Sequence, residues 1–90
     1  MSKEEILKEL KEILIYEDER NRASVEAATE STELVNGLGL TSVSLLYLVI
    51  SIEETFGIRF EKIGVNDFRT VGDTVDYIFR KLQEKEGSGS

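Results

Sequence analysis

One stretch of ten residues, Val43 to Ile52, constrains the fold most, because eight of the ten are apolar. A helix with a single face in a core needs fewer apolar positions than this. At about 100° per residue, the core-facing side is expected to hold Leu45, Leu48, Val49, Ile52 and Phe56. The opposite side holds Val43, Tyr47, Ile50 and Glu54, with Leu46 at its border. We expect this second side to be a mostly apolar surface for a partner, unless the helix is buried all round.

The start of this helix carries the most informative hydroxyl group of the chain. Gly37 and Gly39 supply a flexible approach, and the first helical turn begins at Ser42. The hydroxyl of Ser42 is then expected to lie beside unpaired backbone N–H groups, which together with the helix dipole favour an anion. A phosphodiester attached to Ser42 would suit this position. The ordinary alternative is a helix cap, which is the commonest role of a serine or threonine before an apolar helix.

Two further helices follow from periodicity and capping patterns. Ser2 and Glu5 form a capping box before apolar residues at helical spacing, namely Ile6, Leu7, Leu10, Ile13 and Leu14. Thr70 and Asp73 form a second capping box, and one face of the helix that follows carries Val71, Val75, Ile78 and Leu82. We expect this last helix to fray over Glu84 to Glu86.

The segments between these helices are less periodic. Residues from Tyr16 to Asn36 read as a long connection, in which part of Ser24 to Ala28 is a candidate for an extra helical turn. A short turn of helix is expected near Val65 to Phe68. The last four residues, Gly87 to Ser90, have the composition of a flexible appended linker.

Length and charge restrict the class of protein. A chain of 90 residues forms one small domain with one core. Its 18 acidic and 11 basic residues give a net charge of −7, which disfavours nucleic acid and anionic membranes and favours basic partner surfaces. The chain has no cysteine, no run long enough to span a membrane and no apolar leader after Met1, so a cytoplasmic location is expected.

Independent catalysis is not expected from this inventory of side chains. The sequence has no histidine, no cysteine and no recognisable cluster of metal ligands. Glu53 and Glu54 point about 100° apart on a helix, so they cannot face each other as a catalytic pair. The run from Glu17 to Glu19 lacks the ligand spacing of a calcium loop and is expected to be solvated. Core packing is expected for the aromatic residues Tyr16, Phe60, Phe68, Tyr77 and Phe79.

Two motifs at fixed spacing resemble those of acyl carrier proteins. That family usually has Leu-Gly-x-Asp-Ser-Leu, an apolar helix, and then Glu-Glu-x-Phe-Gly-Ile. This chain has Leu38-Gly39-Leu40-Thr41-Ser42-Val43 and, after the apolar run, Glu53-Glu54-Thr55-Phe56-Gly57-Ile58. The resemblance covers most of residues 3–82. It implies an all-α, four-helix bundle with three long helices and one short helix, over residues 1–84, followed by a flexible tail at 85–90.

The same resemblance implies a function and a covalent cofactor. A phosphopantetheinyl transferase would move 4'-phosphopantetheine from coenzyme A onto Ser42, and the arm would carry an acyl group as a thioester. The partners implied are that transferase and the enzymes that load and transfer acyl groups, in lipid or secondary-metabolite biosynthesis. We expect a monomer that is a carrier and not an enzyme.

The chain departs from the family pattern beside Ser42, where Thr41, Ser44 and Tyr47 occupy positions that are usually acidic. Peptidyl carrier domains usually have Gly-Gly-x-Ser at the attachment site, and Leu40 breaks that pattern. Complementary charge mainly raises association rates, so a specialised partner that reads apolar contacts is expected. The residues predicted to bind partners are Thr41, Val43, Leu46, Tyr47, Ile50, Glu53 and Glu54. The alternative function is a carrier-like interaction module without the arm, which binds through Val43, Tyr47 and Ile50.

Overall fold

The computed structural model describes residues 1–60 and 68–88 and shows a helical protein. Its helices are α1 (Lys3–Glu17), the short 3-10 helix η1 (Glu19–Asn21), α2 (Arg22–Ala27), α3 (Ser42–Phe56) and α4 (Val71–Ser88). Within the described ranges the only β-type pairing is an isolated bridge between Glu33 and Thr70. The predicted all-α fold with three long helices is confirmed. The short turn predicted near Val65 lies outside the described residues, apart from Phe68, which is not helical.

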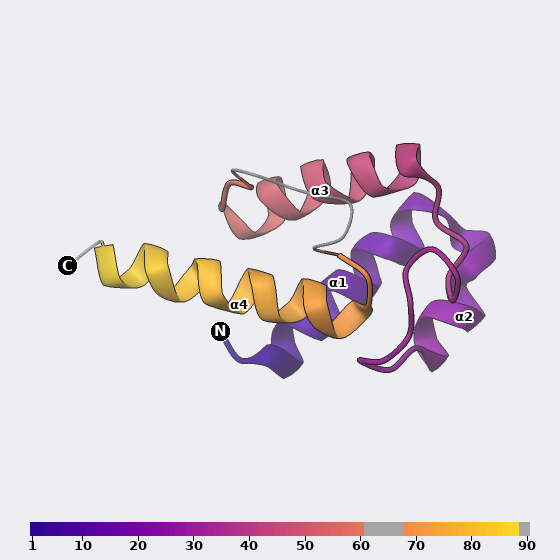
Figure 1. The fold of residues 1–90 in the computed structure, drawn as a ribbon, viewed down its shortest axis with the longest axis horizontal. Coiled ribbons are helices and arrows are strands. Elements are labelled where there is room, and N and C mark those ends of the chain that lie inside the picture. The colour runs from indigo at the N-terminus through magenta and orange to yellow at the C-terminus, as the bar shows by residue number, and fades with distance from the viewer. Residues whose placement is uncertain (61–67, 89–90) are drawn as a thin grey trace.

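Helix α1 packs against α2, α3 and α4 (Figure 1). It begins at the predicted capping box, in which the Ser2 hydroxyl accepts from the backbone N–H of Glu5 and the Glu5 carboxylate accepts from that of Ser2. Three α1 side chains, at positions 6, 10 and 14, are buried. This spacing places all three on one face of the helix, and that apolar face packs into the core.

The core is built from the predicted faces of α1, α3 and α4. Helix α3 contributes Leu48, Ile52 and Phe56, while Leu45 and Val49 of the same face are partly buried. The core of α4 comprises Val71, Val75 and Ile78, with Leu82 partly buried at its edge. Burying each such side chain contributes about 1.5–3 kcal/mol relative to leaving it in water. The apolar pattern therefore fixes which face of each long helix points inward.

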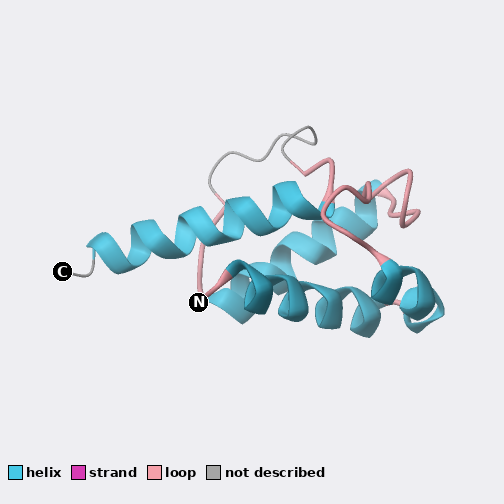
Figure 2. Cartoon of the chain, turned by 90° about the horizontal axis from the view of Figure 1, so that it is seen from below, coloured by secondary structure: helices cyan, strands magenta, loops and turns pink. Residues whose placement is uncertain are grey.

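The long connection before α3 is helical over η1 and α2, and its later part is held by hydrogen bonds to the start of α4. Figure 2 shows this loop region at the end of the molecule opposite the C-terminus. The backbone N–H of Leu34 donates to the carbonyl oxygen of Arg69 at 2.9 Å. In return, the N–H groups of Val71 and Gly72 donate to the carbonyl oxygens of Thr32 and Glu30, at 2.9 and 2.8 Å. A Cβ atom at position 72 would lie 2.9 Å from the Glu30 carbonyl oxygen, so only glycine permits this approach.

The C-terminal part of α4 differs from the prediction. Fraying was expected over Glu84 to Glu86, whereas the helix continues to Ser88. The Lys85 ammonium donates to the Gly57 carbonyl oxygen at 2.9 Å and so ties this end of α4 to the end of α3. Lys81 also lies 3.7 Å from the Glu84 carboxylate. These contacts give a physical reason for the extra turns of helix, while the boundary between the domain and its tail stays a prediction.

The predicted packing of the aromatic residues holds for Phe68, which is buried, and in part for Phe60, Tyr77 and Phe79. Phe60 stacks on Tyr77 with ring centroids 4.9 Å apart, and Phe68 meets both rings edge-on. The prediction was wrong for Tyr16, which is 90% exposed at the end of α1. The surroundings of Tyr16 therefore belong to the surface of the molecule.

Candidate attachment site and docking surface

The approach to Ser42, at the first position of α3, was expected to be flexible but is held by hydrogen bonds at Leu38 and Leu40. Leu38 is buried, and its carbonyl oxygen accepts a hydrogen bond from the Asn21 side chain at 3.2 Å. Gly39 follows with a φ of 73°, in the left-handed region that glycine adopts without strain. The backbone N–H of Leu40 then donates to the carbonyl oxygen of Leu34 at 3.1 Å. Anchoring on both sides of Gly39 therefore fixes where α3 begins.

The cap of α3 is Thr41 and not Ser42. Thr41 has an extended backbone conformation, and its hydroxyl accepts from the N–H of Ser44 at 3.1 Å. The hydroxyls of Thr41 and Ser44 are also hydrogen-bonded to each other, at 3.1 Å. Ser42 is exposed, and its hydroxyl makes no hydrogen bond to the part of the chain that the structure describes. The capping role that sequence alone left open for Ser42 is thus taken by its neighbour.

Backbone donors next to the Ser42 hydroxyl are also available. The N–H groups of Ser42 and Val43 have no acceptor among residues 1–60 and 68–88. The first turn of α3 contains no acidic side chain that would repel an anion. Two free donors at the positive end of a helix are the donor set that a phosphodiester needs. These residues therefore fit a phosphate-linked group on Ser42.

The second side of α3 is exposed in this chain, and we call Val43, Leu46, Tyr47 and Ile50 the docking face. Their side chains are 61%, 60%, 60% and 43% exposed. Burial of the helix all round, the alternative left open by the sequence, is therefore wrong for the single chain. Glu54 is exposed as well. Four large apolar residues on one helix face form the kind of surface that binds another protein.

Glu53 does not share this arrangement with Glu54. It is partly buried, and its carboxylate accepts from the backbone N–H of Phe60 at 2.9 Å. The carboxylate thus satisfies a backbone donor in the segment after α3. The structure separates the two acids that the sequence had grouped for docking, and only Glu54 is free to face a partner.

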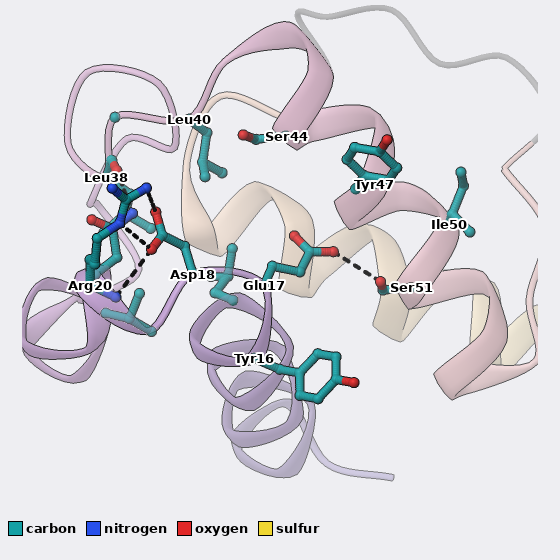
Figure 3. A pocket seen from close by; sticks show the side chains of 14 residues that line it. Tyr16, Glu17, Asp18, Arg20, Leu38, Leu40, Ser44, Tyr47, Ile50 and Ser51 are labelled. Atoms are coloured by element: carbon teal, nitrogen blue, oxygen red, sulfur yellow. Dashed lines mark hydrogen bonds and ion pairs between the residues drawn. The ribbon is translucent and has the colours of Figure 1, made fainter.

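A hollow of about 590 Å³ lies beside the docking face, between the C-terminal end of α1 and α3 (Figure 3). Within it, the Ser51 hydroxyl donates to the Glu17 carboxylate at 2.9 Å. Glu17 is accessible to solvent, yet partial burial of its carboxyl raises its pKa, and the hydrogen bond from Ser51 opposes part of this rise. The sequence predicts a solvated Glu17 and does not reveal this contact, because Ser51 is 34 positions away.

The described residues form neither a metal site nor a membrane-spanning helix. None of their histidine, cysteine, aspartate or glutamate side chains are grouped to hold a metal ion. None of their helices is both long and apolar enough to cross a membrane.

Comparison with known proteins identifies the family. Residues 5–78 match the family model described as the phosphopantetheine attachment site. An acyl carrier protein of Thermotoga maritima is 35% identical over 81 residues, which is 90% of this chain and 96% of that protein. One from Coprothermobacter proteolyticus is 36% identical over 85 residues, covering 94% of this chain and 100% of its own. One from Renibacterium salmoninarum is 36% identical over 77 residues, covering 86% and 91%.

These matches include both motifs and the whole of α3, so the free hydroxyl at the start of that helix lies within a phosphopantetheine-attachment domain. Acyl carrier proteins are carriers and not enzymes, and their cofactor is covalently attached 4'-phosphopantetheine. The chain belongs to the acyl carrier protein family.

Proposed function

We propose that this chain carries an acyl group as a thioester on a 4'-phosphopantetheine arm attached to the Ser42 hydroxyl oxygen. The observation that carries the proposal is the exposed hydroxyl of Ser42 beside two backbone N–H groups, none of which has a hydrogen-bond partner among the described residues. Thr41 makes this arrangement possible, because it provides the cap that Ser42 would otherwise supply. Ser42 is also the residue that matches the modified serine in the acyl carrier pattern.

The chain's own contribution to the attachment reaction is small. Ser42 supplies the nucleophilic oxygen, and no base within the described residues is hydrogen-bonded to its hydroxyl. As this oxygen forms a bond to the phosphorus next to the pantetheine, the pyrophosphate bond of coenzyme A breaks and adenosine 3',5'-bisphosphate leaves, while the hydroxyl proton passes to a group on the phosphopantetheinyl transferase. The N–H groups of Ser42 and Val43 then hold the negative charge of the phosphodiester. The bound group supplies a thiol for the acyl thioester, and the carrier delivers that thioester to enzymes that load or transfer acyl groups.

Partner enzymes would bind around Ser42 through the docking face, together with Thr41 and Glu54. The face is aliphatic and aromatic, whereas acyl carrier proteins typically present several acids on this helix. Tyr47 is the candidate anchor, since tyrosine is enriched among residues that dominate binding energy. The apolar character of this face supports a partner in a specialised pathway. A role of this chain in lipid or secondary-metabolite biosynthesis, its cytoplasmic location and its monomeric state stay predictions.

Intact-protein mass spectrometry after incubation with coenzyme A and a broad-specificity phosphopantetheinyl transferase tests the attachment. The wild-type chain is expected to gain one phosphopantetheinyl group. Ser42→Ala is expected to gain none, and Ser44→Ala, the matched control in the same turn, is expected to gain one. A gain in Ser42→Ala would place the attachment elsewhere. No gain in the wild-type chain with several transferases would favour the interaction module that binds through Val43, Tyr47 and Ile50.

A further inference from the structure

The hollow between α1 and α3 is lined by apolar side chains and by polar ones, which include the carboxylates of Glu17 and Asp18 and the guanidinium of Arg20. Tyr16 at the end of α1 and Tyr47 and Ile50 on α3 line it, and all three side chains are exposed. Figure 3 shows the Glu17 carboxylate between these walls, turned toward Ser51. Exposed aromatic rings beside a carboxylate form a surface that suits a cation with an apolar stem.

The charges around the hollow show that Glu17 is the acid without a counter-ion. Asp18 is paired with Arg20 at 3.1 Å, and Glu19 with Arg22 at 3.1 Å. Glu17 accepts only a neutral hydroxyl, and no cation in the described ranges lies within ion-pair distance of it. The Glu17 carboxylate has no counter-ion among the described residues and lies in the same lining as Tyr16, Tyr47 and Ile50, so it is complementary to a lysine or arginine flanked by apolar residues.

The position of the hollow on α3 indicates which partner supplies that cation. At about 100° per residue, the docking face lies between Ser42 and the hollow around the helix. Gly39, Leu40 and Ser44, which flank Ser42 in the chain, also line the hollow. The enzyme that attaches the arm has to bring the reacting phosphorus of coenzyme A directly to the Ser42 oxygen. Enzymes that act later reach the acyl group through the arm and do not need such close contact at this turn.

We propose that the phosphopantetheinyl transferase that modifies Ser42 covers the docking face and inserts a lysine or arginine side chain into the hollow, where it pairs with Glu17 between Tyr16 and Tyr47. This inference rests on the proposed function. It adds α1 to the surface that the transferase reads, and it assigns a role to an exposed tyrosine and to an acid that the attachment chemistry does not use.

Steady-state kinetics of Ser42 modification tests the pairing, with the transferase that produces the mass gain and the carrier as the varied substrate. Glu17→Gln is expected to raise the KM for the carrier about tenfold, the effect of losing about 1.4 kcal/mol of interaction, with kcat unchanged. Tyr16→Ser is expected to raise KM by a smaller factor, and Tyr16→Phe to leave it near the wild-type value. Glu12→Gln is the matched control, since Glu12 is exposed on α1 and does not line the hollow.

Salt separates the ionic contact from a change in shape. The increase in KM with salt is expected to be smaller for Glu17→Gln than for the wild-type chain, because the variant lacks one screened charge pair. Wild-type KM values for both Glu17→Gln and Tyr16→Ser, with Ser42 still modified, would overturn this proposal and leave the proposed function intact. Failure of the wild-type chain to be modified would instead overturn the proposed function. Unfolding curves of each variant verify that the fold is retained.

Discussion

Helices α3 and α4 begin with the same local device but use their backbone donors differently. Each has a threonine cap whose hydroxyl accepts from the N–H three residues later, Thr41 for Ser44 and Thr70 for Asp73, both at 3.1 Å. In α4, the two N–H groups between these positions donate to carbonyl oxygens of the loop after α2. In α3, the equivalent N–H groups of Ser42 and Val43 have no acceptor within the described ranges.

The comparison shows how one structural element serves stability in one place and binding in another. A donor used within the chain adds about 0.5–1.5 kcal/mol to stability. A donor left at an exposed helix start is solvated at little cost and is available to a ligand. Packing decides between the two outcomes. Gly72 has no side chain and so lets the loop approach α4, whereas the Val43 side chain at the start of α3 is 61% exposed.

Stability is expected to change most when the close approach between Gly72 and the Glu30 carbonyl oxygen is blocked. In Gly72→Ala, the added Cβ would lie 2.9 Å from the Glu30 carbonyl oxygen, so the loop has to move away. We expect the free energy of unfolding to fall by about 1–3 kcal/mol, as in other overpacked sites. Urea unfolding measures this change.

The control for this substitution is Gln83→Ala, at an exposed position of the same helix, with an expected change within about 0.5 kcal/mol. Alanine is ordinarily a better helix former than glycine by roughly 0.5–1 kcal/mol. A gain in stability in Gly72→Ala would therefore contradict the close packing of the loop against α4.

The features of α4 that the sequence predicted are those with local causes. The capping box of Thr70 and Asp73 spans three residues, and the core face follows from helical spacing. The hydrogen bonds from Val71 and Gly72 to the loop join residues about forty positions apart, and no local pattern encodes them. The same holds for the extra length of α4, where Lys85 contacts Gly57.

Amide hydrogen exchange tests whether the backbone donors at the two helix starts differ. The amides of Val71 and Gly72 are expected to exchange at least about tenfold more slowly than those of Ser42 and Val43, because their exchange requires opening of the first turn of α4. After attachment of the arm, the Ser42 and Val43 amides are expected to slow, since they then donate to the phosphodiester. Those of Val71 and Gly72 serve as the internal control and are expected to stay unchanged.

Equal exchange at the two helix starts before attachment would remove the distinction that we draw between them. Slowing at Ser42 and Val43 without any change in the arm-free Ser42→Ala protein would connect the protection to the attached group. Unchanged exchange after attachment would show that these donors do not hold the phosphodiester.

At the candidate site, the sequence predicted where the residues lie better than which contacts they make. The motif located Ser42 and the exposed face of α3, because both follow from spacing along one helix. It did not show that Thr41 takes the cap, since either hydroxyl fits the pattern. Helical spacing placed Glu53 among the docking residues. It could not show that the Glu53 carboxylate accepts a hydrogen bond from the backbone N–H of Phe60, which lies beyond the end of α3. The first difference is a choice between two adjacent hydroxyls, and the second depends on how the chain turns back after α3, so helical spacing predicts neither.

Acid is expected to change stability only slightly through the exposed ion pair of Arg69 and Glu33, which ties the loop to the start of α4. Hydrogen bonds from the Arg69 guanidinium and the Asn36 amide hold the pKa of the Glu33 carboxyl below its ordinary value of 4.5. A lowered pKa in the folded state stabilises the fold above pH 4.5, and this contribution is lost as the pH falls through the lowered pKa. Glu33→Gln is therefore expected to lose less stability between pH 7 and pH 3.5 than the wild-type chain.

For Glu17, at the end of α1 beside α3, the contribution to stability is expected to change with pH in the opposite direction to that of Glu33. The pKa of Glu17 is raised by partial burial, so its contribution favours the folded state at low pH and is lost as the pH rises from 4.5 through the raised pKa. Glu17→Gln removes that contribution and is expected to make the loss of stability in acid steeper. Urea unfolding at pH 7 and pH 3.5 compares both variants with the wild-type chain. Changes of the same sign in the two variants would contradict this assignment, because the Arg69 pair and the partly buried carboxyl shift their pKa values in opposite directions.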